Sequence, residues 1–362
     1  IEQIIADILR EWMEDGTIGD IINNEIFGEI NAIIAKSMDA TTYYTGLKNE
    51  TFYDETALCF WQVTKIPHKD ADGKILQLKQ GFAGDSINSM TLETTREFAS
   101  RKSATFVSNA STFSDTTTKP VGLVIQNGTV LQDAVRQPYN WILGIRNDNT
   151  MKAFPPTTSP STIIGEGYPT ALCGFTPIIQ NGSIVDTSIL ESRGEFTEYH
   201  ARQWLAQDSE KNLYFFTSEG RRMHERGMTF ADCARVTKAY NSDIQFAFQL
   251  DGGGSSQSVY YGSLITQTYD GSGYLDNTQD RPVANFLYIN KPQGNSPTLD
   301  RVFQPVSEIV RIMDKRLNRF DNGNAYIPLN RIELEPYLLN GAIIGGTTGS
   351  SKPWMYVTKN NL

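Results

Sequence analysis

The chain has 362 residues, of which 20% are charged, 39% hydrophobic and 11% aromatic, and its formal net charge is −9. This composition is typical of a folded, aromatic-rich protein and excludes an intrinsically disordered one. The acidic balance, without any run of Lys and Arg, argues against nucleic-acid binding, and no apolar run approaches the roughly 18 residues of a membrane span. The length predicts two or three domains.

The three cysteines are widely spaced and odd in number: Cys59, Cys173 and Cys233. This spacing fits neither a disulfide framework nor a zinc site, so we expect small, buried, hydrophobic side chains. No cofactor is implied by the sequence. A structural divalent cation stays an open alternative.

The first 40 residues have isoleucines at helical spacing. One helix is expected before Asp15-Gly16, and a second begins after Thr17 with Asp20 in the position of a capping-box acid. Their apolar positions are Ile4, Ile5, Ile8, Leu9 and Trp12, then Ile18, Ile22, Ile26 and Ile30. Helices so rich in isoleucine need a partner surface, so residues 1–40 are predicted to be a helical stem or attachment segment.

Residues 41–291 show short apolar runs separated by turns, which predicts an α+β domain with a large mixed sheet. The expected strands lie in 57–66, 104–113, 121–131, 141–150, 175–186, 212–220, 246–254 and 284–289. Helices are expected over 91–102 and 229–240, each capped by a threonine. Asn127-Gly128 and Asn181-Gly182 predict two-residue hairpin turns between apolar runs.

The C-terminal part contains a heptad helix, expected over residues 298–322. Its seam is spaced 3, 4, 3, 4, 3 and flanked by charged residues: Phe303, Val306, Val310, Met313, Leu317 and Phe320. The helix is too short to be stable alone, so it packs on its own chain or, as we favour, joins copies of the chain into a homotrimer. Residues 323–362 are expected to form a small β-rich tip.

The stretch FQLDGGGSSQ, residues 248–257, ends a predicted strand with an acid, three glycines and two serines. A flexible turn is the simplest interpretation, but a turn needs one or two glycines, and each one costs backbone entropy on folding. Glycines are needed where a ligand approaches the main chain closely, and consecutive N–H groups can then bind a phosphate. No nucleotide P-loop, dinucleotide fingerprint or hydrolase nucleophile elbow surrounds this stretch.

Several blocks in this order resemble the phosphodiester glycosidase family, over about residues 55–290. The blocks are TTREFASRKSATFVSNASTF (94–113), KPVGLVIQNGTVL (119–131), HARQWLAQDSEKNLYFFTSEGRR (200–222), GMTFADCARVTKAYNSDIQFAFQLDGGGSSQ (227–257) and RPVANFLYI (281–289). The sequence departs from the family pattern at Gln203-Trp204, where a small residue usually follows the arginine. It departs again in Asn109-Ala110-Ser111-Thr112-Phe113, where the family usually has Asn-Gly-Gly-aromatic.

The resemblance implies hydrolysis of a sugar phosphodiester at the anomeric carbon. Asp251, at the end of a predicted buried strand, is the first candidate for acid/base work or for binding a sugar hydroxyl. Arg202 offers a planar two-pronged grip for the phosphate, although it could equally bridge strands. His200 is a second acid/base candidate, ranked below Asp251 because a lone histidine is more often a satisfied polar group.

Substrate binding is expected from the neighbouring residues. Gly252, Gly253 and Gly254 would let the substrate lie against the main chain, while Ser255 and Ser256 donate hydrogen bonds. Asn109 would fix a sugar hydroxyl or acetamide, or is simply a turn residue. Added positive charge would come from Lys65, Arg221 or Lys119.

Residues 8–34 resemble the linker helices near the front of tail proteins from phages of Gram-positive hosts. This second resemblance implies a trimeric appendage on the virion tail, outside the cell, that contacts other tail proteins and cleaves a cell-wall glycopolymer such as teichoic acid. One alternative is a non-catalytic structural or receptor-binding tail module with the same fold. Another is a secreted, monomeric glycosidase unrelated to phages.

Overall fold

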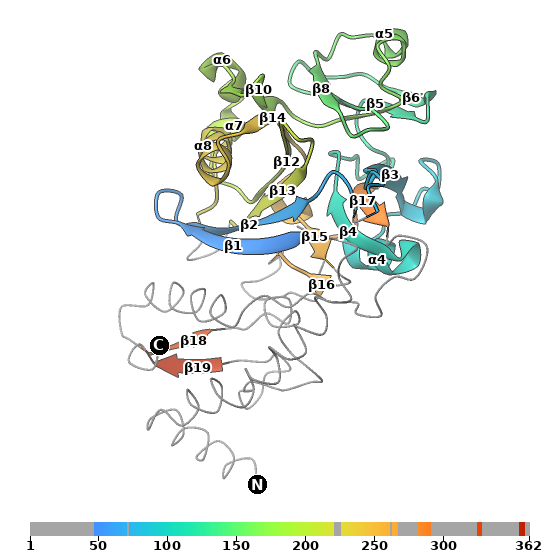
Figure 1. Ribbon diagram of the computed structural model, residues 1–362. Helices are drawn as coiled ribbons and strands as arrows, with labels where there is room; N and C mark the ends of the chain where they lie inside the picture. Colours follow the sequence, from blue (N-terminus) through green and yellow to red (C-terminus); the bar gives the residue numbers. More distant parts are fainter. Residues whose placement is uncertain are drawn as a thin grey trace. The chain divides into compact units, whose positions relative to one another are not determined.

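The computed structural model describes residues 47–70, 72–220, 226–260, 263–266 and 281–290, together with two strands over 324–327 and 355–358 (Figure 1). The chain divides into two compact units, one of residues 44–296 and one of residues 1–43 with 297–362. The expected stem helices of residues 1–40 and the expected heptad helix of 298–322 lie outside the described residues. In the second unit, β18 (Asn324–Ile327) pairs antiparallel with β19 (Met355–Thr358).

The unit of residues 44–296 is built on three antiparallel sheets. The central sheet has the order β1-β2-β13-β12-β14-β10-β11. Its strands are β1 (Lys48–Asp54), β2 (Cys59–Ile66), β13 (Leu213–Ser218), β12 (Arg202–Asp208), β14 (Ile244–Gln249), β10 (Pro177–Gln180) and β11 (Ser183–Ile184). Strands β12 and β13 are buried at every position.

Two five-stranded sheets complete the unit. The second sheet has the order β16-β15-β4-β17-β3, and the hairpin sheet has the order β6-β5-β9-β7-β8. The second sheet comprises β16 (Ser263–Leu264), β15 (Ser258–Tyr260), β4 (Ala104–Asn109), β17 (Asn285–Asn290) and β3 (Lys79–Phe82). The hairpin sheet comprises β6 (Thr129–Asp133), β5 (Leu123–Gln126), β9 (Thr170–Cys173), β7 (Ile142–Ile145) and β8 (Met151–Phe154).

The expectation of α+β structure is confirmed, but the expected mixed sheet is wrong for the described residues. Every strand pairing among them is antiparallel, and three sheets replace one. The reason is in the connections. Neighbouring strands such as β1–β2, β5–β6 and β12–β13 are joined by short turns, and a parallel pair would need a long crossover.

Both expected helices of the middle region are present, and both begin at a capping box. Helix α4 (Thr95–Lys102) is capped by Thr94 with Glu97, and α8 (Phe230–Tyr240) is capped by Thr229 with Asp232. Shorter helical elements include α5 (Pro160–Gly165), α6 (Thr187–Leu190), α7 (Gly194–Thr197) and the 3-10 turn η3 (Ala83–Asp85). No helix in the described ranges has the length and apolarity that crossing a bilayer requires.

The two Asn-Gly hairpins are confirmed in detail. Asn127 and Gly128 have φ of +50° and +76°, and Asn181 and Gly182 repeat these values. Positive φ at both central residues is the two-residue turn that matches the twist of the flanking strands, and the first of these turns joins β5 to β6.

The core lies on both faces of the central sheet. Trp204 stacks on Phe216 with ring centroids 5.1 Å apart, on the face covered by α8, and its indole N–H donates to Thr237 Oγ1 at 2.7 Å. The opposite face packs on the second sheet, where Phe215 and Phe106 lie 4.7 Å apart. Figure 1 shows α6, α7 and α8 together beside β12 and β14. This helical face positions the site described below.

All three cysteines are buried and none forms a disulfide, so they act as the small hydrophobic side chains that their spacing predicted.

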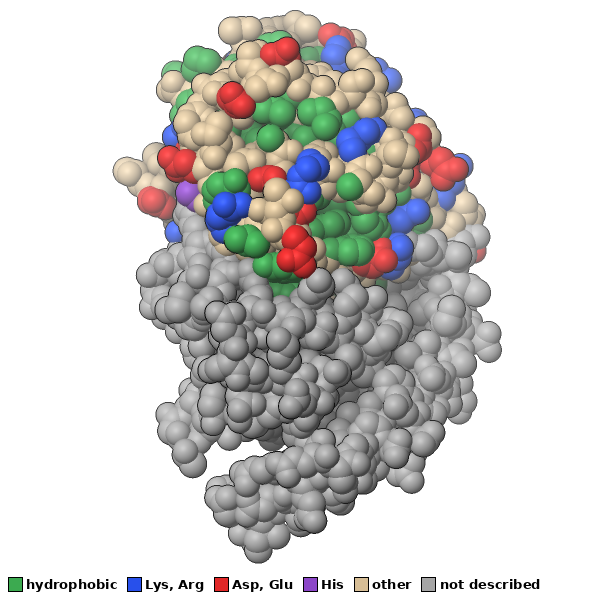
Figure 2. All heavy atoms as spheres, turned by 90° about the vertical axis from the view of Figure 1, so that its left-hand side faces the viewer, with side chains coloured by type: hydrophobic (Ala, Val, Ile, Leu, Met, Phe, Trp, Pro, Cys, Tyr) green, Lys and Arg blue, Asp and Glu red, His purple; other side chains and the backbone are tan. Residues whose placement is uncertain are grey.

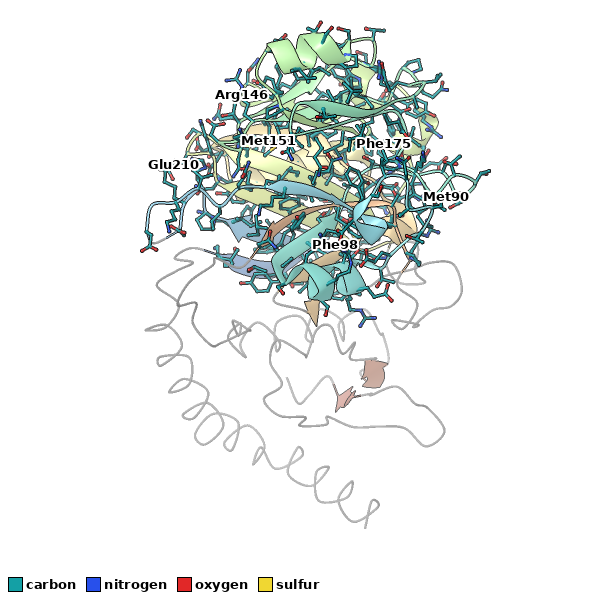
Figure 3. All side chains as sticks on the ribbon, turned by 90° about the vertical axis from the view of Figure 1, so that its right-hand side faces the viewer. Met90, Phe98, Arg146, Met151, Phe175 and Glu210 are labelled. Carbon is teal, nitrogen blue, oxygen red and sulfur yellow. The ribbon has the colours of Figure 1, made fainter. Side chains whose placement is uncertain are left out.

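Helix α4 packs through Phe98, which stacks on Phe286 at 4.1 Å. Figure 3 labels Phe98, which is buried within the unit, and Met90, which lies at its edge and is 73% exposed.

Candidate active site

The segment after β14 folds back across the first residues of β12. In the β12–β14 register Trp204 faces Gln249, and Leu250 N–H donates to Gln203 O at 2.9 Å. Asp251 follows Leu250 directly, and its N–H donates to Ala110 O. Gly253 N–H then donates to Ala201 O at 2.8 Å. This bond holds residues 251–256, called here the glycine segment, against the start of β12.

Two of the glycines are required for this path. A Cβ on Gly252 would lie 3.0 Å from Ala201 O and 3.9 Å from Arg202 Cδ. Gly253 has φ of +62°, a conformation that side chains disfavour, and it opens the short 3-10 turn η4 (Gly253–Ser255). Gly253, Gly254, Ser255 and Ser256 are buried, whereas Asp251 and Gly252 are partly exposed. The segment of residues 251–256 is therefore packed against the protein and is not a flexible loop in solvent.

Asp251, the first residue of the glycine segment, carries the segment's carboxyl group. Its N–H donates to Ala110 O at 2.9 Å, and its Oδ1 accepts the Gly252 N–H at 2.9 Å. Burial raises the pKa of Asp251 to about 6, against the opposing effects of hydrogen bonds from Ser255 and Gly252 and of the charge of Arg281. The negative charge of Glu195 raises this pKa further. A carboxyl with this pKa can hold and release a proton near neutral pH.

Arg202 is 2% exposed, and its guanidinium is bound to the main chain. Its Nε donates to Met228 O at 3.0 Å, and its Nη2 donates to Glu195 O at 2.5 Å and to Glu198 O at 2.9 Å. The guanidinium also lies 4.8 Å above the ring centre of Phe230. Arg202 is thus beside the glycine segment, as the sequence predicted, while a grip on phosphate stays a prediction.

Asn109 and Ser256 carry polar groups without a partner among the described residues. Asn109 is fully buried at the end of β4, where its Oδ1 accepts Gln257 N–H at 3.4 Å and its Nδ2 has no hydrogen bond. Ser256 is 3% exposed, and its Oγ likewise has none. Buried polar groups are normally satisfied, so these two are available to a ligand or a water molecule.

Of the predicted cations Lys65 and Arg221, only Lys65 belongs to the described residues, and it lies far along β2 from the register position of Arg202. Arg202 pairs with Ser218 and Ser218 with Trp61, whereas Lys65 lies four residues further along β2, about 13 Å away at ~3.3 Å per residue. Lys65 Nζ lies 5.7 Å from the ring centre of Tyr214. Arg221 lies outside the described residues.

His200 precedes Arg202 at the edge of the site. It forms an isolated bridge with Met228, and its Nε2 lies 3.1 Å from Glu198 Oε2. An acid/base role for His200 stays a prediction.

Two charged residues that the sequence reading did not single out act on Asp251. Glu195 belongs to α7, and Arg281 precedes β17; the first raises and the second lowers the pKa of the Asp251 carboxyl. Arg281 O also accepts a hydrogen bond from Gln257 Nε2 at 3.1 Å, which links it to the glycine segment. Arg281 is the first residue of the block RPVANFLYI, which resembles the family. This position was the feature of the sequence that could have indicated a functional role for Arg281.

Both departures from the family pattern are built into the packing. Gln203 Nε2 donates to Ser108 Oγ and, at 3.0 Å, to Gln257 O, and its Oε1 accepts Gln257 N–H at 2.8 Å. Ser111 N–H donates to Asn285 Oδ1 at 3.0 Å, and Asn285 Nδ2 donates to Ser111 Oγ at 3.1 Å. Gln203 thus ties β12 of the central sheet to β4 of the second sheet, and Asn285 ties β17 to the segment that follows β4.

Charge is mixed on the side that carries α6, α7 and α8. Figure 2 shows Lys and Arg interleaved there with Asp and Glu. A negatively charged ligand would therefore have to be recognised by local contacts, since the described residues on this face form no broad basic surface. Among the described residues, no group of three or more His, Cys, Asp and Glu side chains is arranged to hold a metal ion.

Comparison with known proteins matches a family described as phosphodiester glycosidase to residues 102–290, just over half of the chain. The chain is 25% identical over 285 residues to the SPbeta prophage-derived uncharacterized protein YomE of Bacillus subtilis (strain 168). That alignment covers 75% of this chain and 42% of YomE, so the chain spans less than half of this relative's length.

Among solved structures, the fold is similar to the catalytic domain of zebrafish N-acetylglucosamine-1-phosphodiester alpha-N-acetylglucosaminidase, auto-inhibited by its pro-peptide. The TM-score is 0.57 at 20% identity, covering 70% of this chain and 87% of that domain. A hypothetical protein from Synechocystis gives a TM-score of 0.47 at 11% identity, covering 67% of this chain and 62% of that one.

Proposed function

The chain belongs to the phosphodiester glycosidase family, and we propose that it hydrolyses the bond between the anomeric carbon of a sugar and a phosphodiester. The main support for the proposal is the raised pKa of the Asp251 carboxyl and its position beside the glycine segment. Burial raises the pKa of this carboxyl to about 6, and Asp251 precedes glycines that pack closely against the start of β12. A carboxyl that holds a proton near neutral pH suits a substrate with a leaving oxygen that must be protonated.

In this proposal, one water molecule is consumed for each bond cleaved. Its oxygen becomes the anomeric hydroxyl, the bond from the anomeric carbon to the phosphate oxygen breaks, and the phosphate leaves as a monoester. Asp251 donates a proton to the departing oxygen. The unpartnered Asn109 Nδ2 and Ser256 Oγ donate hydrogen bonds to sugar or phosphate oxygens. Arg281, whose charge already acts on the Asp251 carboxyl, supplies positive charge for the phosphate.

The biological setting we propose is a homotrimeric virion tail appendage outside the host cell that cleaves a wall polymer such as teichoic acid. Support comes from the prophage origin of the relative in Bacillus subtilis and from the phage-like helices expected in residues 8–34. The net charge of −9 disfavours long-range attraction of a polyanion. Cleavage would therefore depend on contacts within the site.

The test is hydrolysis of wall teichoic acid and of small glycosyl phosphodiesters by the full chain in 18O-labelled water. We expect reducing ends and phosphomonoesters in equal amounts, with the label on the sugar. Label on the phosphate would mean cleavage of the P–O bond and would contradict a glycosidase. Asp251→Asn should lower the rate constant kcat by ~10²–10⁴-fold, the usual contribution of a general acid.

A second candidate is a non-catalytic structural or receptor-binding module of the tail. It is favoured by one observation: the guanidinium of Arg202 is bound to three main-chain carbonyls, and a guanidinium so placed serves the fold. This candidate predicts binding of the polymer without release of reducing ends. Retention of bound polymer by the wild type and by Asp251→Asn alike, with no product from either, would favour it over the enzyme.

A further inference from the structure

Glu195 is held in place from several sides, although it lies on a helix of only four residues. Its Oε2 forms an ion pair with Arg193 Nη2 at 2.8 Å, and Arg193 in turn lies 4.3 Å above the ring centre of Tyr139. The next residue, Phe196, stacks on Phe230 of α8 with centroids 4.1 Å apart. The Glu195 side chain keeps 35% of its surface exposed, so water reaches the carboxylate.

Arg202 connects helix α7 to the glycine segment. Its Nη2 binds the carbonyls of Glu195 and Glu198, while its Cδ borders the position where a Cβ of Gly252 would be. Asp251 is the residue immediately before Gly252. One buried arginine therefore fixes the main chain of Glu195 relative to the segment that carries Asp251. The negative charge of Glu195 raises the pKa of the Asp251 carboxyl.

We propose that Glu195 is the second carboxylate of the reaction, taking a proton from the attacking water, and that Arg202 is the positioning residue that sets Glu195 beside Asp251. This proposal rests on the hydrolysis proposed above. The water oxygen bonds to the anomeric carbon as its proton passes to Glu195, and the bond to the phosphate oxygen breaks as that oxygen receives the proton of Asp251. Exchange with solvent then returns Glu195 to its carboxylate and Asp251 to its acid.

Glu195→Gln tests the first part, with Glu191→Gln as the matched control. Glu191 is an exposed carboxylate in the same connection between β11 and β12. We expect Glu195→Gln to lower kcat at least ~100-fold, because its amide cannot take a proton from the attacking water. Glu191→Gln should keep the wild-type kcat. If Glu195→Gln matched this control in kcat, the proposal would be overturned.

Arg202→Lys tests the positioning role. Lysine keeps the charge but cannot span carbonyls on both α7 and the Met228 segment. We expect kcat to fall at least tenfold with KM changed less than threefold. A rise in KM with kcat unchanged would instead mean that Arg202 binds the substrate phosphate and would refute the positioning role.

An activity-free measurement separates failure of this inference from failure of the proposed function. In an NMR titration of the folded full chain, Glu195→Gln should lower the pKa of Asp251, because it removes a nearby negative charge, while Glu191→Gln should leave it unchanged. A wild type that is inactive on every substrate would overturn the proposed function, and with it the catalytic role of Glu195, even if this coupling is found. An active wild type without the coupling would overturn the inference alone.

Discussion

Asp251 has a pKa of about 6 in the folded protein against an ordinary value of 3.8, and this difference has a consequence for stability. The folded protein binds this proton more tightly than the unfolded chain does. The free energy of unfolding therefore falls as pH rises from about 4 to about 6, by an amount on the order of 3 kcal/mol at most. Above pH 6 the charged carboxylate destabilises the fold.

We accordingly expect Asp251→Asn to be more stable than the wild type at pH 7.5 and about equally stable near pH 3.5, while losing activity. Urea unfolding at the two pH values measures this difference. The buried Asp208→Asn variant is the control: Asp208 accepts hydrogen bonds from Tyr214 and Asn212, so its loss should destabilise the protein. Lower stability of Asp251→Asn at pH 7.5 would show that the carboxylate does not carry the cost inferred here.

At this scale the sequence predicts residues whose position follows from their own strand. Asp251 and Gly252 follow the last residue of an alternating run, so their place at the end of β14 could be read directly. Glu195 could not be found in this way, because it lies in a stretch without periodicity and its position is set by hydrogen bonds from Arg202, a residue of another element. The distance of Lys65 from Arg202 could not be predicted either, because it follows from the register of β2 with β13.

At the scale of elements, the glycine segment and the start of β12 pack closely against each other and share a main-chain hydrogen bond. Gly252→Ala would place a Cβ 3.0 Å from Ala201 O, the carbonyl that also accepts Gly253 N–H, so one of these two main-chain segments must shift. We expect a stability loss of about 1 kcal/mol and a larger loss of activity, because Asp251 moves with the segment. Gly165→Ala, whose Cβ would meet nothing within 4 Å, is the control.

Thermal unfolding and kcat measured on both variants check this expectation. Full activity in a folded Gly252→Ala protein would mean that the close approach of the two segments is not needed for the site. A loss of activity as large in Gly165→Ala would mean that the effect is not local.

Elements were predictable where their signals are local. The Asn-Gly turns and the threonine caps of α4 and α8 are set by a few neighbouring residues, and the structure contains them as expected. The division into three antiparallel sheets was not predictable, because it depends on which distant strands pair. Strand β14, for example, lies between β12 and β10, and no local pattern in the sequence encodes that order.

At the scale of the whole molecule, the two compact units divide the proposed tasks. Asp251, Glu195, Arg202 and Arg281 all belong to residues 44–296, whereas the residues of the predicted heptad seam belong to the unit of residues 1–43 and 297–362. If assembly and hydrolysis are separate properties, each can be removed without the other. This separation leads to a prediction about mass and activity together.

The full chain should have a mass in solution of three times 40.5 kDa by light scattering. Val310→Asp with Leu317→Asp places two charges in the predicted seam and should give a lower mass, whereas Arg311→Asp with Asn318→Asp changes outer positions and should keep the trimer. Activity per chain on a small soluble phosphodiester should survive in both variants. A trimer without activity would favour the non-catalytic tail module, and a wild-type monomer with activity would favour a stand-alone glycosidase. Loss of activity together with trimerisation would mean that the site depends on the assembled state.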